Sequence, residues 1–278
     1  MAFRTILTIA GLECGDDDID LAARLTAEAD AHLSVYVVAT AAPPPVGAYA
    51  AMISDAWVQE RQADTERLEA RLAELTSRLA ARQVRADIAG AYPENAWADD
   101  VIGQRGRYAD LTFVGPDMLA SETLKEKVIE GALFFSGKPL LLVPAGVPPT
   151  LRPQRVMVAW DSRIEASRAV REALDVLKGA QEVRLVLVDP EEGDDAHGEE
   201  PGADAAVYLV RHGVRVGVDR LPGLGRPTSE VLRRHAHDMG ADMIVMGGYG
   251  HSRLRQRILG GVTRSMIEEP PLPILMAR

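Results

Sequence analysis

The chain of 278 residues is 47% hydrophobic and 26% charged, a composition typical of a globular protein with one large domain or two ordinary ones. Its formal net charge of −10 disfavours broad binding to nucleic acid or anionic membranes, because an acidic surface repels phosphate. The single cysteine, Cys14, excludes an intrachain disulfide and agrees with a cytoplasmic location; the apolar run after Met1 is too short for a signal peptide, and no stretch approaches the ~20 apolar residues of a membrane span.

The N-terminal half alternates short apolar strands with helical segments. We expect strands at Thr5–Ala10, Leu33–Val38, Val84–Ile88, Leu111–Val114 and Leu140–Val143. A long charged helix at about Ala50–Ala81 separates the second strand from the third. The strands are continuous apolar runs, which is typical of parallel strands that helices cover on both faces.

A proline-rich segment follows the fifth strand. Residues Pro144–Gln154 read PAGVPPTLRPQ and lack hydrophobic periodicity, as in a short and stiff linker. We therefore divide the chain into a domain at 1–146, a linker at 147–154 and a second domain at 155–278.

The C-terminal half repeats the pattern of the first. Its expected strands are Arg155–Trp160, Glu182–Val188, Val214–Asp219, Asp242–Met246 and Leu272–Ala277, and its helices begin near Arg163, Ala203, Pro227 and Gly261. Three pairs of similar segments recur in the same order in the two halves, so the gene looks duplicated. Each half predicts a doubly wound α/β domain with a five-stranded parallel sheet.

The most distinctive stretch is MGGYGHSRLRQRILGGVTRSM, from Met246 to Met266. It follows a predicted strand, at the edge where doubly wound sheets bind their ligands. Glycines there allow positive φ and a close approach of backbone to ligand, and a helix N-terminus offers unpaired N–H groups to an anion. Four basic residues add positive charge: Arg253, Arg255, Arg257 and Arg264. The loop therefore predicts a phosphate site.

The spacing Gly247-x2-Gly250-x9-Gly260, after ADMIVMG and before a terminal apolar strand, resembles the universal stress protein (UspA) family in its tandem, two-domain form. The resemblance covers nearly the whole chain. It implies an adenine-nucleotide-binding, stress-response protein in which the loop wraps the phosphates of ATP with Mg²⁺, Asp161 contacts the ribose and Val188 lies against adenine. The implied contact set is Ala159, Asp161, Val188, Gly247, Gly250, His251, Arg253, Gly260, Gly261, Val262 and Thr263.

Both halves depart from the family pattern. Gly261 stands where nucleotide-binding members carry serine or threonine, so we expect ATP affinity to be lower by about one to two decades, with Thr263 two residues further on. In the first half Ala10 aligns with Asp161, Met118 replaces the second glycine, and Glu126 and Lys127 stand opposite Gly260 and Gly261. We expect this half to be a degenerate copy that packs against the second.

Other interpretations stay open. The glycine loop can be only a tight connection, and Asp161 can cap the next helix. The chain can then be a nucleotide-free scaffold that acts through protein partners. Slow ATPase activity would need a positioned base, and the sequence places none, so we expect no enzyme, no catalytic residue and no metal site among the protein's side chains.

Several smaller features have structural interpretations. Cys14 lacks an activating neighbour, and His235 and His237 face different sides of a helix. His251 reads as a solvated or phosphate-adjacent side chain rather than a catalytic base. The segment Leu221–Ser229 lacks the third glycine of a dinucleotide fingerprint and reads as a loop with a proline-started helix. The terminal strand can pair with a second copy or satisfy the other half internally, as a pseudo-dimer.

Overall fold

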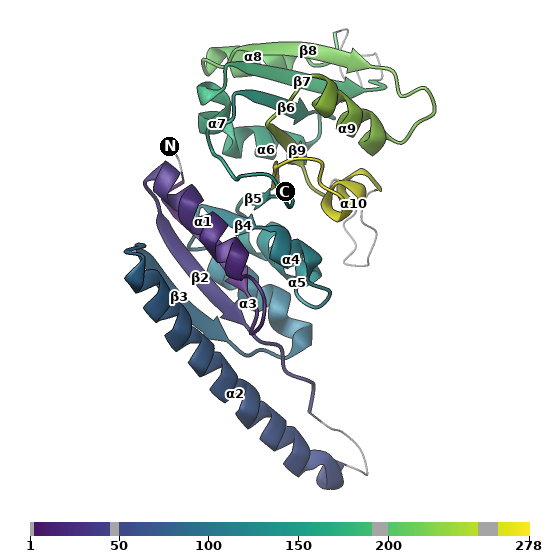
Figure 1. Cartoon of the computed structure of the whole chain (residues 1–278). Helices are drawn as coiled ribbons and strands as arrows, with labels where there is room; N and C mark the ends of the chain where they lie inside the picture. Colours follow the sequence, from purple (N-terminus) through teal and green to yellow (C-terminus); the bar gives the residue numbers. More distant parts are fainter. Residues whose placement is uncertain (1–2, 45–49, 191–199, 250–260) are drawn as a thin grey trace. The chain divides into compact units, whose positions relative to one another are not determined.

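Contacts divide the chain into two compact units, Phe3–Ser136 and Gly137–Arg278, here named the N-terminal and the C-terminal unit. The computed structural model describes residues 3–44, 50–190, 200–249 and 261–278, with only the backbone at 50–54. Each unit is built of alternating strands and helices, so the predicted α/β class is confirmed (Figure 1). None of the helices in these ranges has the length and apolar character that a membrane span requires.

The N-terminal unit holds a parallel sheet in the order β3-β2-β1-β4. Its elements are β1 (Thr5–Ala10), α1 (Asp16–Ala29), β2 (His32–Val38), α2 (Ala50–Ala81), β3 (Ala86–Ala91), η1 (Asn95–Trp97), α3 (Ala98–Gly106), β4 (Leu111–Val114), α4 (Pro116–Ala120), α5 (Lys125–Glu130) and η2 (Gly131–Ser136). On β3, Gly90 faces Leu68 and Leu72 of α2, whereas Asp87 binds Arg105 of α3. Because side chains alternate along a strand, helices cover both faces of this sheet.

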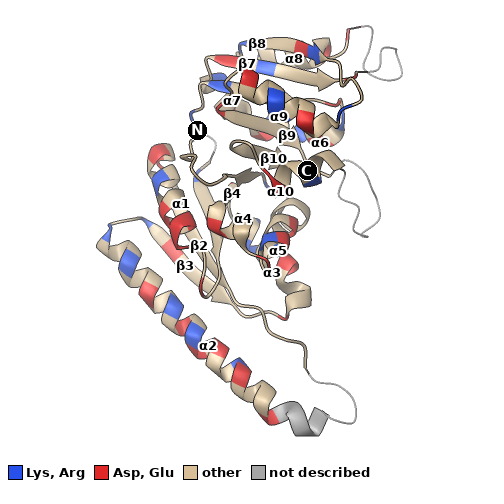
Figure 2. Ribbon diagram, turned by 45° about the vertical axis from the view of Figure 1, so that its right-hand side comes forward, with Lys and Arg blue, Asp and Glu red and all other residues tan. Residues whose placement is uncertain are grey.

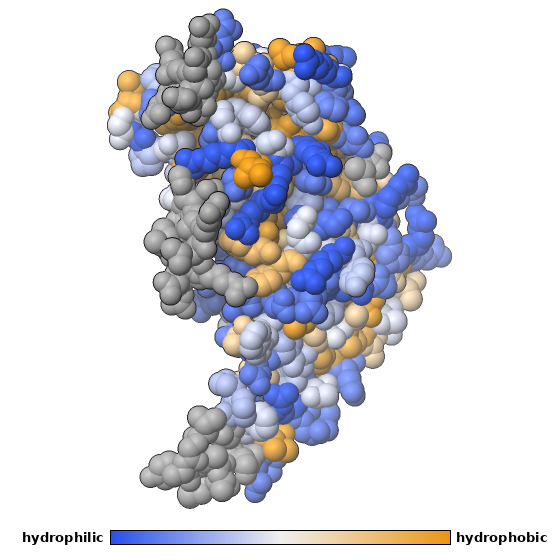
Figure 3. Space-filling view, turned by 180° about the vertical axis from the view of Figure 1, so that it is seen from behind, coloured by the Kyte–Doolittle hydropathy of each residue, from blue (hydrophilic) through white to orange (hydrophobic). Residues whose placement is uncertain are grey.

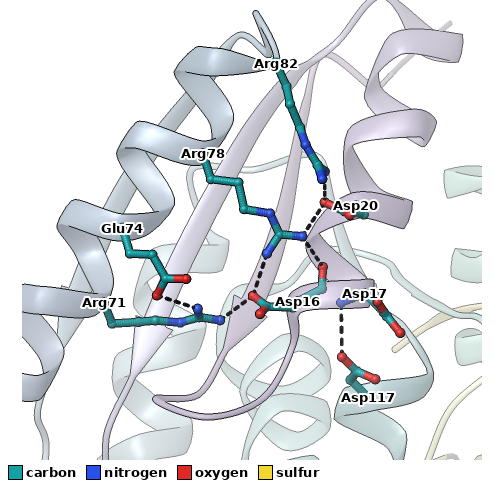
Figure 4. Close-up of polar contacts among 8 residues, drawn as sticks. All are labelled: Asp16, Asp17, Asp20, Arg71, Glu74, Arg78, Arg82 and Asp117. Atoms are coloured by element: carbon teal, nitrogen blue, oxygen red, sulfur yellow. Dashed lines mark hydrogen bonds and ion pairs between the residues drawn. The ribbon is translucent and has the colours of Figure 1, made fainter.

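Arginines fasten the long helix α2 to α1. Arg71 Nη2 lies 2.5 Å from Asp16 Oδ1, and Arg78 reaches Asp16 at 2.9 Å and Asp20 at 2.8 Å (Figure 4). Below these pairs, α2 buries a stripe of leucines: Leu68, Leu75 and Leu79. Figure 2 shows acidic and basic residues distributed along the same helix. Apolar burial and ion pairs thus both hold α2 in place.

The C-terminal unit has strand order β5-β10-β9-β6-β7-β8. Its elements are β5 (Leu140–Leu142), β6 (Arg155–Ala159), α6 (Ile164–Glu172), α7 (Leu174–Gly179), β7 (Glu182–Val188), α8 (Ala203–Arg211), β8 (Val216–Leu221), α9 (Thr228–Asp238), β9 (Met243–Gly247), α10 (Gly261–Glu268) and β10 (Ile274–Ala277). Strands β10-β9-β6-β7-β8 are parallel, as the sequence predicts, whereas β5 pairs antiparallel with β10. The division into units therefore falls before β5, while the sequence places the end of the first domain at 146.

The third strand of each half begins two residues later than predicted. β3 begins at Ala86 instead of Val84, and β8 at Val216 instead of Val214. The N–H of Val84 donates to Leu79 O and that of Val214 to Leu209 O, the six-residue bond that closes a Schellman motif after a helix. The two valines end helices, which a strand-forming residue type does not reveal.

The terminal strand β10 has neighbours on both sides. Ile274 pairs with Ile244 of β9 and with Leu142 of β5. Both hydrogen-bonding edges of β10 are therefore used within the C-terminal unit, to which β5 and β9 belong. A homodimer formed by adding a strand to β10 would have to displace β5.

Candidate functional site

A cavity opens at the carboxyl ends of the C-terminal unit's strands. Strand β6 lies between β9 and β7, and β9 lies between β6 and β10. The strand order therefore reverses between β6 and β9. Ligands of doubly wound sheets bind beside such a reversal. The cavity measures about 810 Å³ and is lined by the ends of β6, β7 and β9 and by the starts of α9 and α10.

The residues predicted to contact a nucleotide meet at this cavity wherever the structure describes them. They are Ala159, Asp161, Val188, Gly247, Gly261, Val262 and Thr263. The other four predicted residues, Gly250, His251, Arg253 and Gly260, lie outside the described ranges, as do Arg255 and Arg257. Arg264 is described and lies on α10, where its Nε is 2.7 Å from Glu268 Oε1.

Helix α10 brings its first turn to the cavity. Gly261 is its first residue, and a Cβ added there would meet no heavy atom within 4 Å. The first N–H groups of an α-helix have no acceptor within the helix and lie at the positive end of its dipole. The cavity wall at Gly261, Val262 and Thr263 can therefore bind a negatively charged group.

Thr263 holds the exit of β9 against α10. Its side chain is 7% exposed, and its Oγ1 accepts a hydrogen bond of 3.3 Å from the N–H of Tyr249. Tyr249 has the left-handed φ of 63°, which is rare for an aromatic residue. The Thr263 hydroxyl accepts this bond, so its own proton remains available to a ligand.

Gly247 has a packing role that the sequence does not reveal. A Cβ at this position would lie 2.5 Å from the N atom of Ala166 and 2.7 Å from the carbonyl carbon of Glu165, at the start of α6. Its φ is not positive, unlike that of Tyr249. The glycine therefore admits the first turn of α6 while it also lines the cavity, and it lacks the positive φ that we expected at this strand end.

Asp161 follows β6 at the cavity wall. Its Oδ1 accepts a 3.2 Å bond from the N–H of Arg163, and Arg163 occupies the N-cap position of α6. The Asp161 carboxylate thus stabilises the turn before the helix without being the cap residue itself. Its side chain is 56% exposed and its Oδ2 lies 3.8 Å from Arg163 Nε. An exposed carboxylate here can accept hydrogen bonds from ligand hydroxyl groups.

The start of α9 also lines the cavity, through Thr228, Ser229 and Glu230. The sequence predicts a proline-started helix at Pro227, without a binding role for it. The signal was the strand-then-helix order itself, which places every helix N-terminus of this sheet at the ligand edge. Trp160, with its Nε1 3.1 Å from Ser162 Oγ, is a further lining residue that the prediction did not include.

In the N-terminal unit a carboxylate fills the corresponding place after β4. Asp18 is fully buried and accepts bonds from the N–H groups of Asp117 (3.0 Å) and Met118 (2.9 Å). A Cβ at Gly115, which follows β4 as Gly247 ends β9, would lie 2.2 Å from Asp18 Oδ1. Burial raises the pKa of Asp18, although these amide bonds oppose the rise. An internal anion thus takes the amides that follow the strand, which agrees with a degenerate first half.

The remaining ionisable candidates have structural partners. His235 Nε2 lies 3.0 Å from Asp219, and the Arg184 guanidinium beside Asp219 holds the pKa of that carboxyl below its usual value. Burial raises the pKa of the Cys14 thiol, which disfavours the reactive thiolate. Over the described ranges, no three His, Cys, Asp or Glu side chains converge as a metal site.

Residues 153–278 match the model of the Universal stress protein family. A universal stress protein of Synechocystis sp. is 30% identical over 74 residues, which are 27% of this chain and 25% of the relative. One of Methanocaldococcus jannaschii is 34% identical over 55 residues, 20% of this chain and 33% of the relative. The chain thus aligns with a third or less of the length of these curated relatives.

Solved structures resemble the fold over both halves. A universal stress protein from Archaeoglobus fulgidus superposes with a TM-score of 0.67 at 20% identity, covering 98% of this chain and 96% of its own. A putative universal stress protein from Pseudomonas aeruginosa gives 0.58 at 12% identity, covering 99% and 93%. At these identities the likeness is one of fold.

Proposed function

Because the chain belongs to the universal stress protein family through residues 153–278, we propose that its C-terminal unit binds an adenine nucleotide, ATP with Mg²⁺, and that the bound state alters contacts with a protein partner. The carrying observation is the cavity of about 810 Å³ at the strand reversal, onto which the first turn of α10 opens. That volume lies within the usual range of small-molecule sites, roughly 300–1,000 Å³.

The lining residues suit the parts of a nucleotide. The amides of Gly261, Val262 and Thr263 would hold phosphate oxygens. The exposed carboxylate of Asp161 would accept hydrogen bonds from ribose hydroxyl groups, and Val188 offers an apolar surface to the base. A bound Mg²⁺ would neutralise phosphate charge and would enter as the nucleotide complex, since Mg²⁺ in nucleotide sites is held largely by substrate phosphates and water.

The second candidate is a nucleotide-free scaffold of the same fold, working in the cytoplasm as part of a stress response. It is favoured by Gly261, which supplies no hydroxyl, and by Asp18, which fills the other half's strand-end amides. On the side that Figure 3 displays, hydrophobic residues lie in small groups among hydrophilic ones rather than in a broad apolar face for docking. Native mass spectrometry of freshly purified protein separates the candidates, since a retained nucleotide mass excludes the scaffold.

Isothermal titration with ATP and Mg²⁺ tests the proposal directly. The wild-type protein should release or absorb heat at millimolar ligand or below, since a 1 mM Kd is about 4 kcal/mol of binding. Gly261→Asp should abolish the signal, because its carboxylate would enter open space where phosphate is expected. Gly179→Asp is the matched control, as its Cβ is equally unobstructed at the end of α7. No heat with wild-type protein contradicts the proposal.

A further inference from the structure

Helix α9 begins at the cavity with unused hydrogen-bond donors. It runs for 11 residues from Thr228, and its N-cap residue, Pro227, supplies no side-chain cap. The N–H groups of Glu230 and Val231 donate to the carbonyl of Pro227 at 2.9 and 3.2 Å. Those of Thr228 and Ser229 have no acceptor within the part of the chain that the structure describes. They are free to bind a ligand.

The side chain of Ser229 provides a second and independent observation. Ser229 is 6% exposed, yet it is one of the residues that line the cavity. Its hydroxyl has no hydrogen-bond partner among the described residues, and its oxygen is not one of their fully enclosed unpartnered atoms, so it is accessible from the cavity. A nine-tenths-buried donor that opens onto a cavity is the arrangement expected of a ligand contact.

Arg233, on α9, links this helix to α10, and the first residues of both helices line the cavity. Its Nε donates to Glu269 O at 3.2 Å and its Nη2 donates to Ser265 O, near the end of α10. The two helices therefore pack against each other while the first turns of both line the same cavity. The positive ends of two helix dipoles act on one volume, which favours a ligand with more than one negative group.

We propose that the first turn of α9, with Ser229, is a second oxyanion subsite of this cavity, which binds a distal phosphate of a chain whose other phosphates lie at α10. The inference rests on the proposed nucleotide function and adds a specificity to it. A triphosphate offers several anionic groups to the two helix starts that line the cavity, whereas a monophosphate offers one. The site thereby selects ATP over AMP. The exposed carboxylate of Glu230, which also lines the cavity, repels a phosphate at this subsite and so reduces the preference for ATP over AMP.

The test compares Ser229→Ala with Ser167→Ala, an exposed serine on α6 away from the cavity. Trp160 reports binding by fluorescence, since the other two tryptophans lie in the N-terminal unit. We expect wild type and Ser167→Ala to bind ATP more tightly than AMP. Ser229→Ala should weaken ATP binding about tenfold or more, the effect of one hydrogen bond to a charged group, and leave AMP within about twofold. Equal losses for both ligands, or no loss, overturn the inference.

Sodium tripolyphosphate separates this inference from the proposed function. If the wild type binds no nucleotide, the nucleotide proposal fails, but tripolyphosphate still probes the two helix starts. Its binding should shift the backbone ¹⁵N–¹H resonances of Thr228 and Ser229 in the wild-type protein. This readout needs no variant and so is unaffected if Ser229→Ala folds poorly. Unmoved resonances at saturating tripolyphosphate overturn the subsite.

Discussion

Replacing Gly261 by serine should tighten ATP binding by about tenfold to a hundredfold. A Cβ at this position meets no heavy atom within 4 Å, so the new side chain enters open cavity space without steric cost. Its hydroxyl would add one donor to the phosphates, and a hydrogen bond to a charged group contributes about 1.5–3 kcal/mol. At about 1.4 kcal/mol per decade of affinity, this gives roughly one to two decades.

The assay is isothermal titration of ATP and Mg²⁺ into the variant, with Gly179→Ser as the control. Gly179 also has an unobstructed Cβ position, at the end of α7, so its substitution changes helix propensity without touching the cavity. The control should bind ATP as the wild type does. A Gly261→Ser variant that unfolds normally and binds ATP no more tightly would refute the reasoning that phosphates lie at the start of α10.

Arg184→Met should move the acid unfolding of the C-terminal unit to higher pH. The lowered pKa of Asp219 stabilises the folded state at pH values above 3.8, the ordinary pKa of this carboxyl, and that stability is lost as the pH falls through the folded-state pKa. Circular dichroism over pH 2–5 measures it, and an unchanged midpoint contradicts it. Arg71→Met should cost about 1–2 kcal/mol in urea unfolding, since Arg71 is 9% exposed while its partner is half exposed. Arg85→Met, at a pair whose side chains are 74% and 79% exposed, should leave the free energy of unfolding unchanged; a loss equal to that of Arg71→Met would contradict this. Arg233→Met should increase amide hydrogen exchange in α10 and weaken ATP binding, because Arg233 donates to Ser265 O and Glu269 O. Unaltered exchange would show that these two bonds do not stabilise α10.

Sequence periodicity predicts the strands because they are buried on both faces. β1, β4 and β7 begin and end where the sequence predicts them, although β7 includes Glu182 and Arg184. The starts of the edge strands β3 and β8 were predicted two residues too early. Val84 and Val214 lie in the turns that end the preceding helices, but valine at these positions looks like the first residue of a strand. Antiparallel pairing of β5 with β10 was not predictable, since register between distant segments leaves no local pattern.

Site residues at strand ends and glycines were predicted from the sequence. Residues of common types that line the cavity only because of their place in the fold, such as Ser229, were missed. Ala159, Asp161 and Val188 line the cavity because they end neighbouring strands. Ser229 carries no such signal, as serine is common at any helix start. The buried role of Asp18 was equally hidden, because three consecutive aspartates at the start of a helix read as favourable dipole partners.

The most direct measurement of the central claim is a crystal structure of the protein with ATP and Mg²⁺. We expect phosphate oxygens at about 2.7–3.2 Å from the backbone nitrogens of Gly261, Val262 or Thr263. We also expect the ribose beside Asp161 at the end of β6. A nucleotide bound elsewhere, or an α10 whose first amides point away from the phosphates, would contradict the claim.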